Sequence, residues 1–229
     1  MKSIKYFLIA GIITISTLVN AQVNSPRTIY VGAGFGGTLG GGNLKTERYG
    51  RSQSAGCLGA GVNFGLKAQY SFSDKFSAGI YFKKGATGYA NTSENYEWNK
   101  LTSKTIIYGV EAKYFLFNKR KILLSLGPQF GLVSSNDGIE LGDGVESFDG
   151  YEEDGSSKGF NYGLNFGLNL FWSQHIGMFV DVGLNGASLK GDLDKVYKYD
   201  YRISGIGVAA AIGIVTKFGG TPPPPPREY

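Results

Sequence analysis

Hydrophobic residues alternate with small or polar residues along most of the chain, with a period of two positions. The clearest stretch is 57–72, where every even position is apolar or aromatic and every odd position is small or polar. Residues 121–132 and 160–172 largely repeat this pattern. Since successive side chains of a β-strand point to opposite faces of a sheet, this period predicts strands with one apolar face.

Five further stretches alternate less regularly and bring the number of predicted strands to eight. The predicted strands cover residues 28–37, 57–72, 75–86, 104–117, 121–132, 160–172, 175–188 and 202–218. Short turns are expected at 73–74, 118–120 and 173–174, and longer connections at 38–56, 87–103, 134–158 and 189–201. Short periplasmic turns and longer extracellular loops are typical of outer-membrane barrels. The pattern therefore predicts an all-β, eight-stranded antiparallel up-and-down transmembrane barrel.

Closure of the sheet follows from the environment that such strands would meet. Most of them exceed the roughly 9–11 residues that a tilted strand needs to cross a bilayer. In lipid, every backbone amide and carbonyl needs an internal partner, and a closed barrel leaves no open edge. Eight strands enclose a lumen that side chains can fill. A soluble barrel with an apolar interior, such as a lipocalin, is the alternative.

Three segments divide the chain. Residues 1–21 have the features of a cleavable signal peptide: Lys2 and Lys5 precede an apolar stretch, and cleavage is expected after Ala21. A retained membrane anchor is the alternative. Residues 22–218 form the predicted barrel, and residues 219–229 form a Pro-rich tail, which we expect to be a periplasmic spacer or a disordered end.

Composition agrees with a membrane barrel. The chain has 36 Gly, 15 Tyr and 15 Phe residues, which suits closely packed strands with aromatic girdles. The formal charge of +5 is too small to indicate nucleic-acid binding. Aromatic residues cluster near the predicted membrane boundaries, and we expect them to form the girdles. They are Tyr70, Phe72, Phe76, Tyr114, Phe115, Phe117, Phe171 and Trp172 near the short turns, and Tyr89, Phe160 and Tyr201 near the longer loops.

Few residues could carry catalysis. Barrel enzymes generally use a histidine near the outer rim, and the one histidine, His175, adjoins a predicted periplasmic turn. Residues 32–37 and 205–210 fit a dinucleotide-binding fingerprint, but no helix follows either of them. Cys57 is the one cysteine, so no disulfide can form within the chain. We therefore predict a non-enzymatic protein without a cofactor or a metal site.

Polar residues on the inward face of the predicted strands are the candidate functional residues. Charges in a narrow lumen must be paired or hydrated, so a structural network that plugs the lumen is expected, with Glu111 as its centre. A narrow path for ions or small solutes is the alternative. The predicted network consists of Lys67, Lys83, Glu111, Lys113, Gln129, Asn165 and Asp181.

The third long connection is acidic. Residues 136–158 hold eight carboxylates, Asp137 among them, without the twelve-residue spacing of a calcium-binding loop. A solvated loop is expected. A weak divalent-cation site, or contact with metal-bridged lipopolysaccharide, is the alternative.

The segment 66–77, with the sequence LKAQYSFSDKFS, resembles a hairpin of the outer-membrane β-barrel domain family, the small OmpA/OmpX-type barrels. The resemblance implies residence in the outer membrane of a Gram-negative cell, contact with lipid and lipopolysaccharide, and insertion by the barrel assembly machinery. It implies roles in membrane integrity, adhesion or host contact, so we predict a structural or surface-interaction role. The extracellular loops and the Pro-rich tail are the candidate sites for a protein partner. A narrow channel or transporter, or an accessory subunit of an export or assembly complex, is the alternative. The tail after Phe218 departs from the family pattern, in which a terminal aromatic residue often ends the chain.

Overall fold

The computed structural model describes residues 23–48, 51–92, 98–119, 121–141, 152–193 and 199–219. They form eight strands, as predicted. The strands are β1 (Thr28–Arg48), β2 (Arg51–Ser71), β3 (Phe76–Asn91), β4 (Trp98–Lys119), β5 (Ile122–Leu141), β6 (Glu152–Phe171), β7 (Ile176–Leu193) and β8 (Tyr199–Gly219). No helix within these residues is long and apolar enough to cross a membrane.

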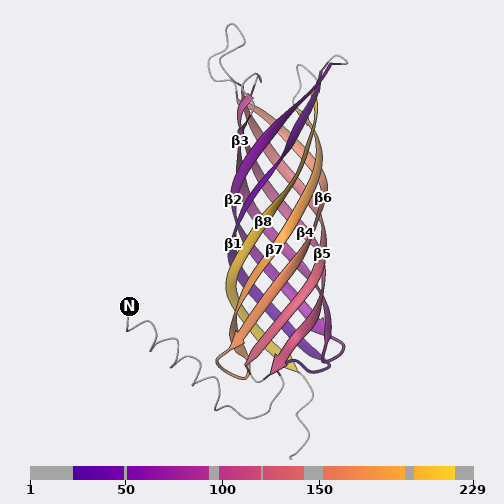
Figure 1. Ribbon diagram of the computed structural model, residues 1–229, viewed down its shortest axis with the longest axis vertical. Helices are drawn as coiled ribbons and strands as arrows, with labels where there is room; N and C mark the ends of the chain where they lie inside the picture. The colour runs from indigo at the N-terminus through magenta and orange to yellow at the C-terminus, as the bar shows by residue number, and fades with distance from the viewer. Residues whose placement is uncertain are drawn as a thin grey trace, which may run out of the picture.

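The sheet is a closed up-and-down barrel. Each strand pairs with the next in antiparallel orientation, and β8 pairs with β1 (Figure 1). The strands tilt strongly relative to the barrel axis, as the pairing register between neighbouring strands shows. A path of paired residues that leaves Lys45 on β1 and passes through all the other strands returns to β1 at Phe35, nearer the start of that strand. Tilt and register shift of this kind are what closing eight strands requires.

The two ends of the barrel differ. At one end, here the turn end, β1 begins, β8 ends and three short turns join β2 to β3, β4 to β5 and β6 to β7 (Figure 1). Two of these turns close in the same way, because Ser73 Oγ accepts from the amides of Lys75 and Phe76, and Ser173 Oγ from those of His175 and Ile176. The opposite end is the loop end.

The strands reach further toward the loop end than the sequence pattern indicated. The predicted connection 38–56 is wrong: β1 and β2 remain paired up to Arg48 and Arg51. The predicted acidic loop 136–158 is likewise shorter, because β5 runs to Leu141 and β6 starts at Glu152. Backbone pairing needs no apolar face, so glycine-rich and charged stretches continue the strands without the alternation that marks them. The carboxylates of residues 142–151 lie outside the described residues.

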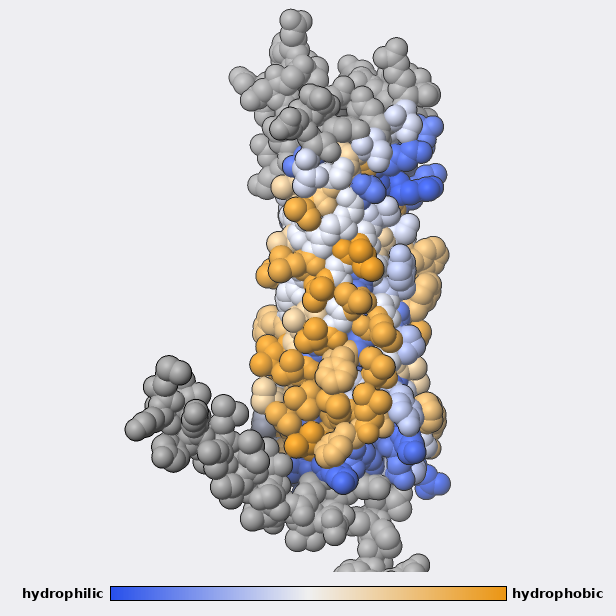
Figure 2. Space-filling model, in the orientation of Figure 1, coloured by the Kyte–Doolittle hydropathy of each residue, from blue (hydrophilic) through white to orange (hydrophobic). Residues whose placement is uncertain are grey.

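Apolar side chains cover the outside of the barrel in a wide belt. Figure 2 shows this belt over the middle and lower part of one face, with hydrophilic residues toward both ends. Val62 is 71% exposed and Phe35 is 70% exposed. A continuous apolar surface of this extent would be unfavourable in water. Other residues of the belt on successive strands are Leu66, Ile80, Val110, Phe130, Leu164, Leu184 and Ile212.

The predicted aromatic girdles are confirmed in part. Tyr70, Phe72 and Trp172 point outward near the turn end, and Phe160 does so near the other edge of the belt. Four others face the lumen instead. These are Tyr89, Phe115, Phe171 and Tyr201. They occupy the alternate positions of their strands that face the lumen. Nearness to a predicted membrane boundary does not show which face of a strand a residue lies on.

Candidate functional site

The lumen is layered along the barrel axis. Two apolar clusters lie at its ends, and a polar layer lies between them. The turn-end layer consists of Val23, Tyr30, Phe115, Leu123, Phe171, Phe179 and Val215. The loop-end layer consists of Leu44, Ala55, Cys57, Leu101, Val133, Leu189, Tyr201 and Ile203. The polar layer consists of Lys67, Gln69, Tyr81, Lys83, Glu111, Lys113, Gln129, Asn161, Asn165, Asp181 and Asn185.

The segment that precedes β1 fills the mouth of the barrel at the turn end. Asn24 is fully buried there; its side chain donates to the carbonyls of Ser73 and Asp74, both at 3.0 Å. Its backbone amide donates to Asn118 Oδ1 at 2.8 Å, and Tyr30 donates its hydroxyl to Asn24 Oδ1 at 2.9 Å. This contribution has no signal in the sequence, because Val23 and Asn24 lie before the first strand and show no periodicity.

Phe179 fills the centre of the turn-end layer because glycines make room for its ring. Gly34 on β1 and Gly213 on β8 are paired and both face the lumen. A β-carbon at Gly34 would lie 2.7 Å from the Phe179 ring, and one at Gly213 would lie 2.6 Å from it. Real side chains do not approach so closely, so these two positions admit only glycine while the ring stays in place.

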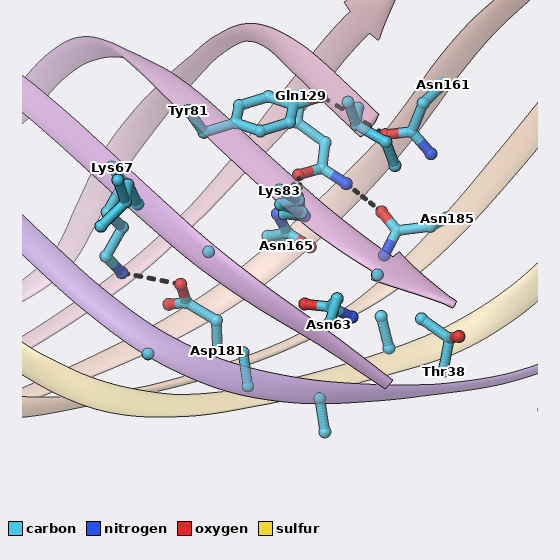
Figure 3. Close-up of a pocket in the computed structure, with 18 of the residues that line it drawn as sticks. Thr38, Asn63, Lys67, Tyr81, Lys83, Gln129, Asn161, Asn165, Asp181 and Asn185 are labelled. Atoms are coloured by element: carbon cyan, nitrogen blue, oxygen red, sulfur yellow. Dashed lines mark hydrogen bonds and ion pairs between the residues drawn. The ribbon is translucent and has the colours of Figure 1, made fainter. Parts of the chain in front are cut away.

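Asp181 on β7 is the most heavily paired carboxylate of the polar layer. Lys67 on β2 reaches it across the lumen, with Nζ 2.8 Å from Oδ2 (Figure 3). Lys113 on β4 lies 3.6 Å from Asp181 Oδ1 and 3.7 Å from Glu111 Oε2. The Lys67 ammonium also sits 3.4 Å from the centre of the Phe179 ring, which joins this layer to the turn-end layer by a cation–π contact.

Gln129 on β5 organises the other half of the polar layer. Its Oε1 accepts from Lys83 at 3.2 Å and from Asn165 at 2.7 Å, and its amide donates to Asn185 (Figure 3). Amide side chains can donate and accept at once, so Gln129 links a cation to two neutral groups. The hydrogen bonds connect β3, β5, β6 and β7 through the lumen.

All seven predicted lumen residues lie in the polar layer, but their partners differ from expectation. Glu111 is not the centre of the network: it accepts from Gln69 and has one cation, Lys113, within 4 Å among the described residues. Lys83 on β3 donates to Gln129 and not to Glu111. Asp181 binds Lys67 across the lumen. The register and tilt of the strands decide these pairings, and neither can be derived from one strand alone.

Lys113 is the most deeply buried cation of the layer. Its side chain is 2% exposed, and no hydrogen-bond partner of its ammonium lies within the described residues. Two cavities of about 140 Å³ each adjoin in the lumen and share Thr38, Thr105 and Asn185 among their walls. Cavities of this size have room for ordered water beside Glu111 and Asp181, which line one of them.

A second carboxylate site lies at the level of the loop-end layer, to which its Tyr201 belongs. Asp137 on β5 is 2% exposed and accepts from the hydroxyls of Ser103, Ser135, Ser157 and Tyr201. The Ser135 and Ser157 bonds measure 2.6 Å each. No cation lies within 4 Å of it in the described part of the chain. We name these five residues the hydroxyl cage.

Asp137 was predicted to lie in a solvated loop, and that prediction is wrong, because Asp137 belongs to β5. The inward register of β5 continues without a break from Gln129 through Val133 and Ser135 to Asp137. Short polar side chains at alternate positions were the available signal. An apolar-polar criterion cannot detect a strand whose two faces are both polar, as here beyond the belt.

The remaining candidate residues are apart from this network. His175 is exposed at the turn end, and its Nδ1 lies 3.1 Å from the carbonyl of Lys217. Cys57 is a buried free thiol within the loop-end layer. No group of three or more His, Cys, Asp or Glu residues in the described ranges is arranged to hold a metal ion.

Comparison with known proteins extends this description at the level of the fold. No protein-family model matches the chain, and no curated protein matches its sequence. Among solved structures, the outer membrane protein OprG from Pseudomonas aeruginosa superposes with a TM-score of 0.64, at 12% identity over 86% of this chain and 98% of that one. The outer membrane protein AlkL, solved in lipid bilayers, superposes with a TM-score of 0.50, at 12% identity over 93% of this chain and 99% of that one.

These likenesses confirm the predicted fold. The chain is an eight-stranded antiparallel up-and-down barrel, a fold that it shares with these two outer-membrane proteins. At 12% identity, no residue role can be carried from either protein to this chain.

Proposed function

We propose that the protein is an integral outer-membrane barrel with a structural or surface-interaction role, without enzymatic activity and with a lumen closed to solutes. The observation that carries this proposal is the combination of an apolar belt outside and apolar layers at both ends of the lumen. A belt of this kind is stable against lipid chains and unfavourable in water. The closed sheet satisfies the backbone groups that lipid could not.

The belt also supports an orientation. The turn end carries the short turns and the start of the described chain, so it is proposed to face the periplasm. The loop end then faces outward, toward lipopolysaccharide and extracellular partners. Insertion by the barrel assembly machinery belongs to the same proposal.

Two apolar layers support a closed lumen. Leu123 in the turn-end layer and Leu101 in the loop-end layer have no exposed surface, and Val215 and Leu44 are 1% exposed. An ion on the axis would have to pass the apolar side chains of both layers, at a desolvation cost. The polar layer is then a hydrated interior compartment between two barriers.

A narrow solute path is the second candidate, and one observation favours it. The two adjoining cavities extend through the polar layer into the loop-end layer, where Val133, Leu189 and Ile203 line one of them. A path would need the apolar layers to open. Swelling of proteoliposomes in solutions of small sugars or amino acids would reveal it.

The membrane location is tested by one arginine placed at two depths. On β2 the outward apolar positions run from Leu58 to Phe72, with Leu66 midway. Leu66→Arg is expected to destabilise the folded protein by about 2–4 kcal/mol in lipid vesicles, and Leu58→Arg by about 0–1 kcal/mol, because the cost of a cation depends on depth. Urea titration followed by the gel shift between boiled and unboiled samples measures both.

The same gels check the wild type. A folded barrel resists unfolding by detergent, so boiled and unboiled samples should migrate differently. Equal costs for the two arginine variants, or recovery of the wild type as a water-soluble periplasmic protein, would contradict the proposed membrane location.

A further inference from the structure

Four exposed cations outside the barrel lie in one paired row. Lys158 on β6 pairs with Lys190 on β7, Lys190 pairs with Arg202 on β8, and Arg202 pairs with Lys45 on β1. All four side chains point outward and are exposed. We name these residues the basic row. Because the strands tilt, the row rises obliquely, from Lys158 beside the belt to Lys45 nearer the loop end.

Such a row is unfavourable by itself. Like charges directly opposite one another on neighbouring strands destabilise a sheet. Neighbouring strands lie only ~4.8 Å apart, well within the distance over which salt screens charges. The ion pairs of the described residues all lie in the lumen, so the row makes no direct ion pair among them; Glu47, Asp192 and Asp200 face outward two positions further along the strands. A bound anion would remove the repulsion.

The residues on the two sides of the basic row indicate from which side an anion would approach it. On the side of the row toward the belt stand Phe160, Ser188 and Ser204, all neutral. On the other side, Asp192 and Asp200 stand two positions nearer the loop end and face outward. The surface therefore changes from neutral to basic to acidic within a few residues.

This order favours an anion that approaches from the membrane. A phosphate at the surface of the lipid layer reaches Lys158 and Lys190 without passing a carboxylate. A long polyanion extending from solution would have to cross Asp192 and Asp200. The row also ends on both sides at serine, since Lys158 pairs with Ser134 and Lys45 pairs with Ser54. The basic surface is thus confined to one side of the barrel.

We propose that the basic row binds the phosphate groups of a phosphorylated lipid in the leaflet that surrounds the loop end. This inference rests on the proposed function, because it needs the belt to lie in an outer membrane whose outward leaflet carries lipopolysaccharide. Ammonium and guanidinium groups form charge-assisted hydrogen bonds with phosphate oxygens, and four of them in register present several such bonds to one lipid headgroup. Phe160 lies beside Lys158, where it would meet the lipid chains below the phosphate.

The experiment compares two double variants that remove the same charge. Lys158→Gln/Lys190→Gln removes the two row cations nearest the belt, and Lys75→Gln/Lys119→Gln removes two exposed cations at the turn end. Binding of diphosphorylated lipid A to the purified full-length protein in detergent micelles is measured for each. We expect the row variant to bind about tenfold more weakly or worse, and the turn-end variant to match the wild type.

Two further arms identify the chemistry. Lipid A stripped of its phosphates should bind the wild type as weakly as diphosphorylated lipid A binds the row variant. Inorganic phosphate at the same concentration should not compete. Equal losses in both double variants, binding that does not depend on the lipid phosphates, or full competition by inorganic phosphate would each overturn the proposal.

The stability of the row variant and the wild type toward urea provides an independent test. In vesicles of phosphatidylcholine alone, the row variant should be at least as stable toward urea as the wild type, because its cationic repulsion is reduced. Diphosphorylated lipid A in the vesicles should stabilise the wild type and leave the row variant unchanged; a row variant stabilised as much as the wild type would overturn the proposal. A wild type that never folds in vesicles would instead contradict the membrane location, so the two failures can be told apart.

Discussion

The lumen holds two buried carboxylates in different ways. Asp181, in the polar layer, has cations on two sides, Lys67 and Lys113, which come from strands across the barrel. Asp137, in the hydroxyl cage, has four neutral donors and no cation within 4 Å among the described residues. A buried charge can thus be compensated by an opposite charge or by hydrogen bonds that converge on it.

The two arrangements differ in how much stability the protein should lose when one of their members is removed. Removing one member of a charged cluster leaves the opposite charge buried without compensation. Removing one hydroxyl from a cage leaves the other donors in place, so the loss is closer to one hydrogen bond. The comparison therefore expects large effects in the polar layer and smaller ones in the cage.

The largest effect is expected for Lys113→Met. This change removes the cation that lies between Glu111 and Asp181 while keeping the volume of the side chain. We expect the free energy of unfolding in lipid vesicles to fall by about 3–5 kcal/mol. Lys119→Met, at an exposed position near the end of the same strand, is the control and should have little effect. Similar costs for the two variants would show that Lys113 is merely hydrated, and the contrast between the two sites would be lost.

An intermediate effect is expected for Asp137→Ala, which leaves four hydroxyls without their shared acceptor. Urea unfolding should show a loss of about 1–3 kcal/mol, because the donors are buried and must find other partners. Asp200→Ala, an exposed carboxylate on β8, is the matched control and should change stability little. A loss as large as that of Lys113→Met would mean that the cage holds a charge as critical as the polar layer does.

The smallest effect is expected for Tyr201→Phe. The ring stays in the loop-end layer and one donor to Asp137 is lost, so the expected cost is about 1 kcal/mol. In the Asp137→Ala background the same change should cost less still, because its acceptor is already gone. Two additive losses in this double-mutant cycle would contradict a direct hydrogen bond between Tyr201 and Asp137.

The same contrast shows how far the sequence could predict the site. Alternation of residue types assigned Lys67, Glu111 and Asp181 to the inward face correctly, because the outward neighbours on those strands are apolar. It failed for Asp137, where both faces of β5 are polar beyond the belt. The strand number, antiparallel order and turn positions followed from the same alternation, whereas the strand ends at the loop end did not.

The hydrogen-bond partners of each lumen residue could not be predicted from the sequence. Lys83 binds Gln129 rather than Glu111 because the register of β3, β4 and β5 sets which side chains share a level. Asn24 enters the lumen through contacts with the turn that follows β2 and with the end of β4, far from it in sequence. Long-range pairing of this kind has no local signature.

The central claim is that apolar layers at both ends close the lumen around a hydrated polar layer. Electrical recording across a planar lipid bilayer tests it most directly, with the purified full-length wild type inserted in a neutral-pH salt solution. The account expects no steady open state with a defined conductance at moderate voltage, because ions would have to cross both the turn-end and the loop-end layer. A stable, long-lived open channel in the wild type would contradict the closed lumen and favour a transport function.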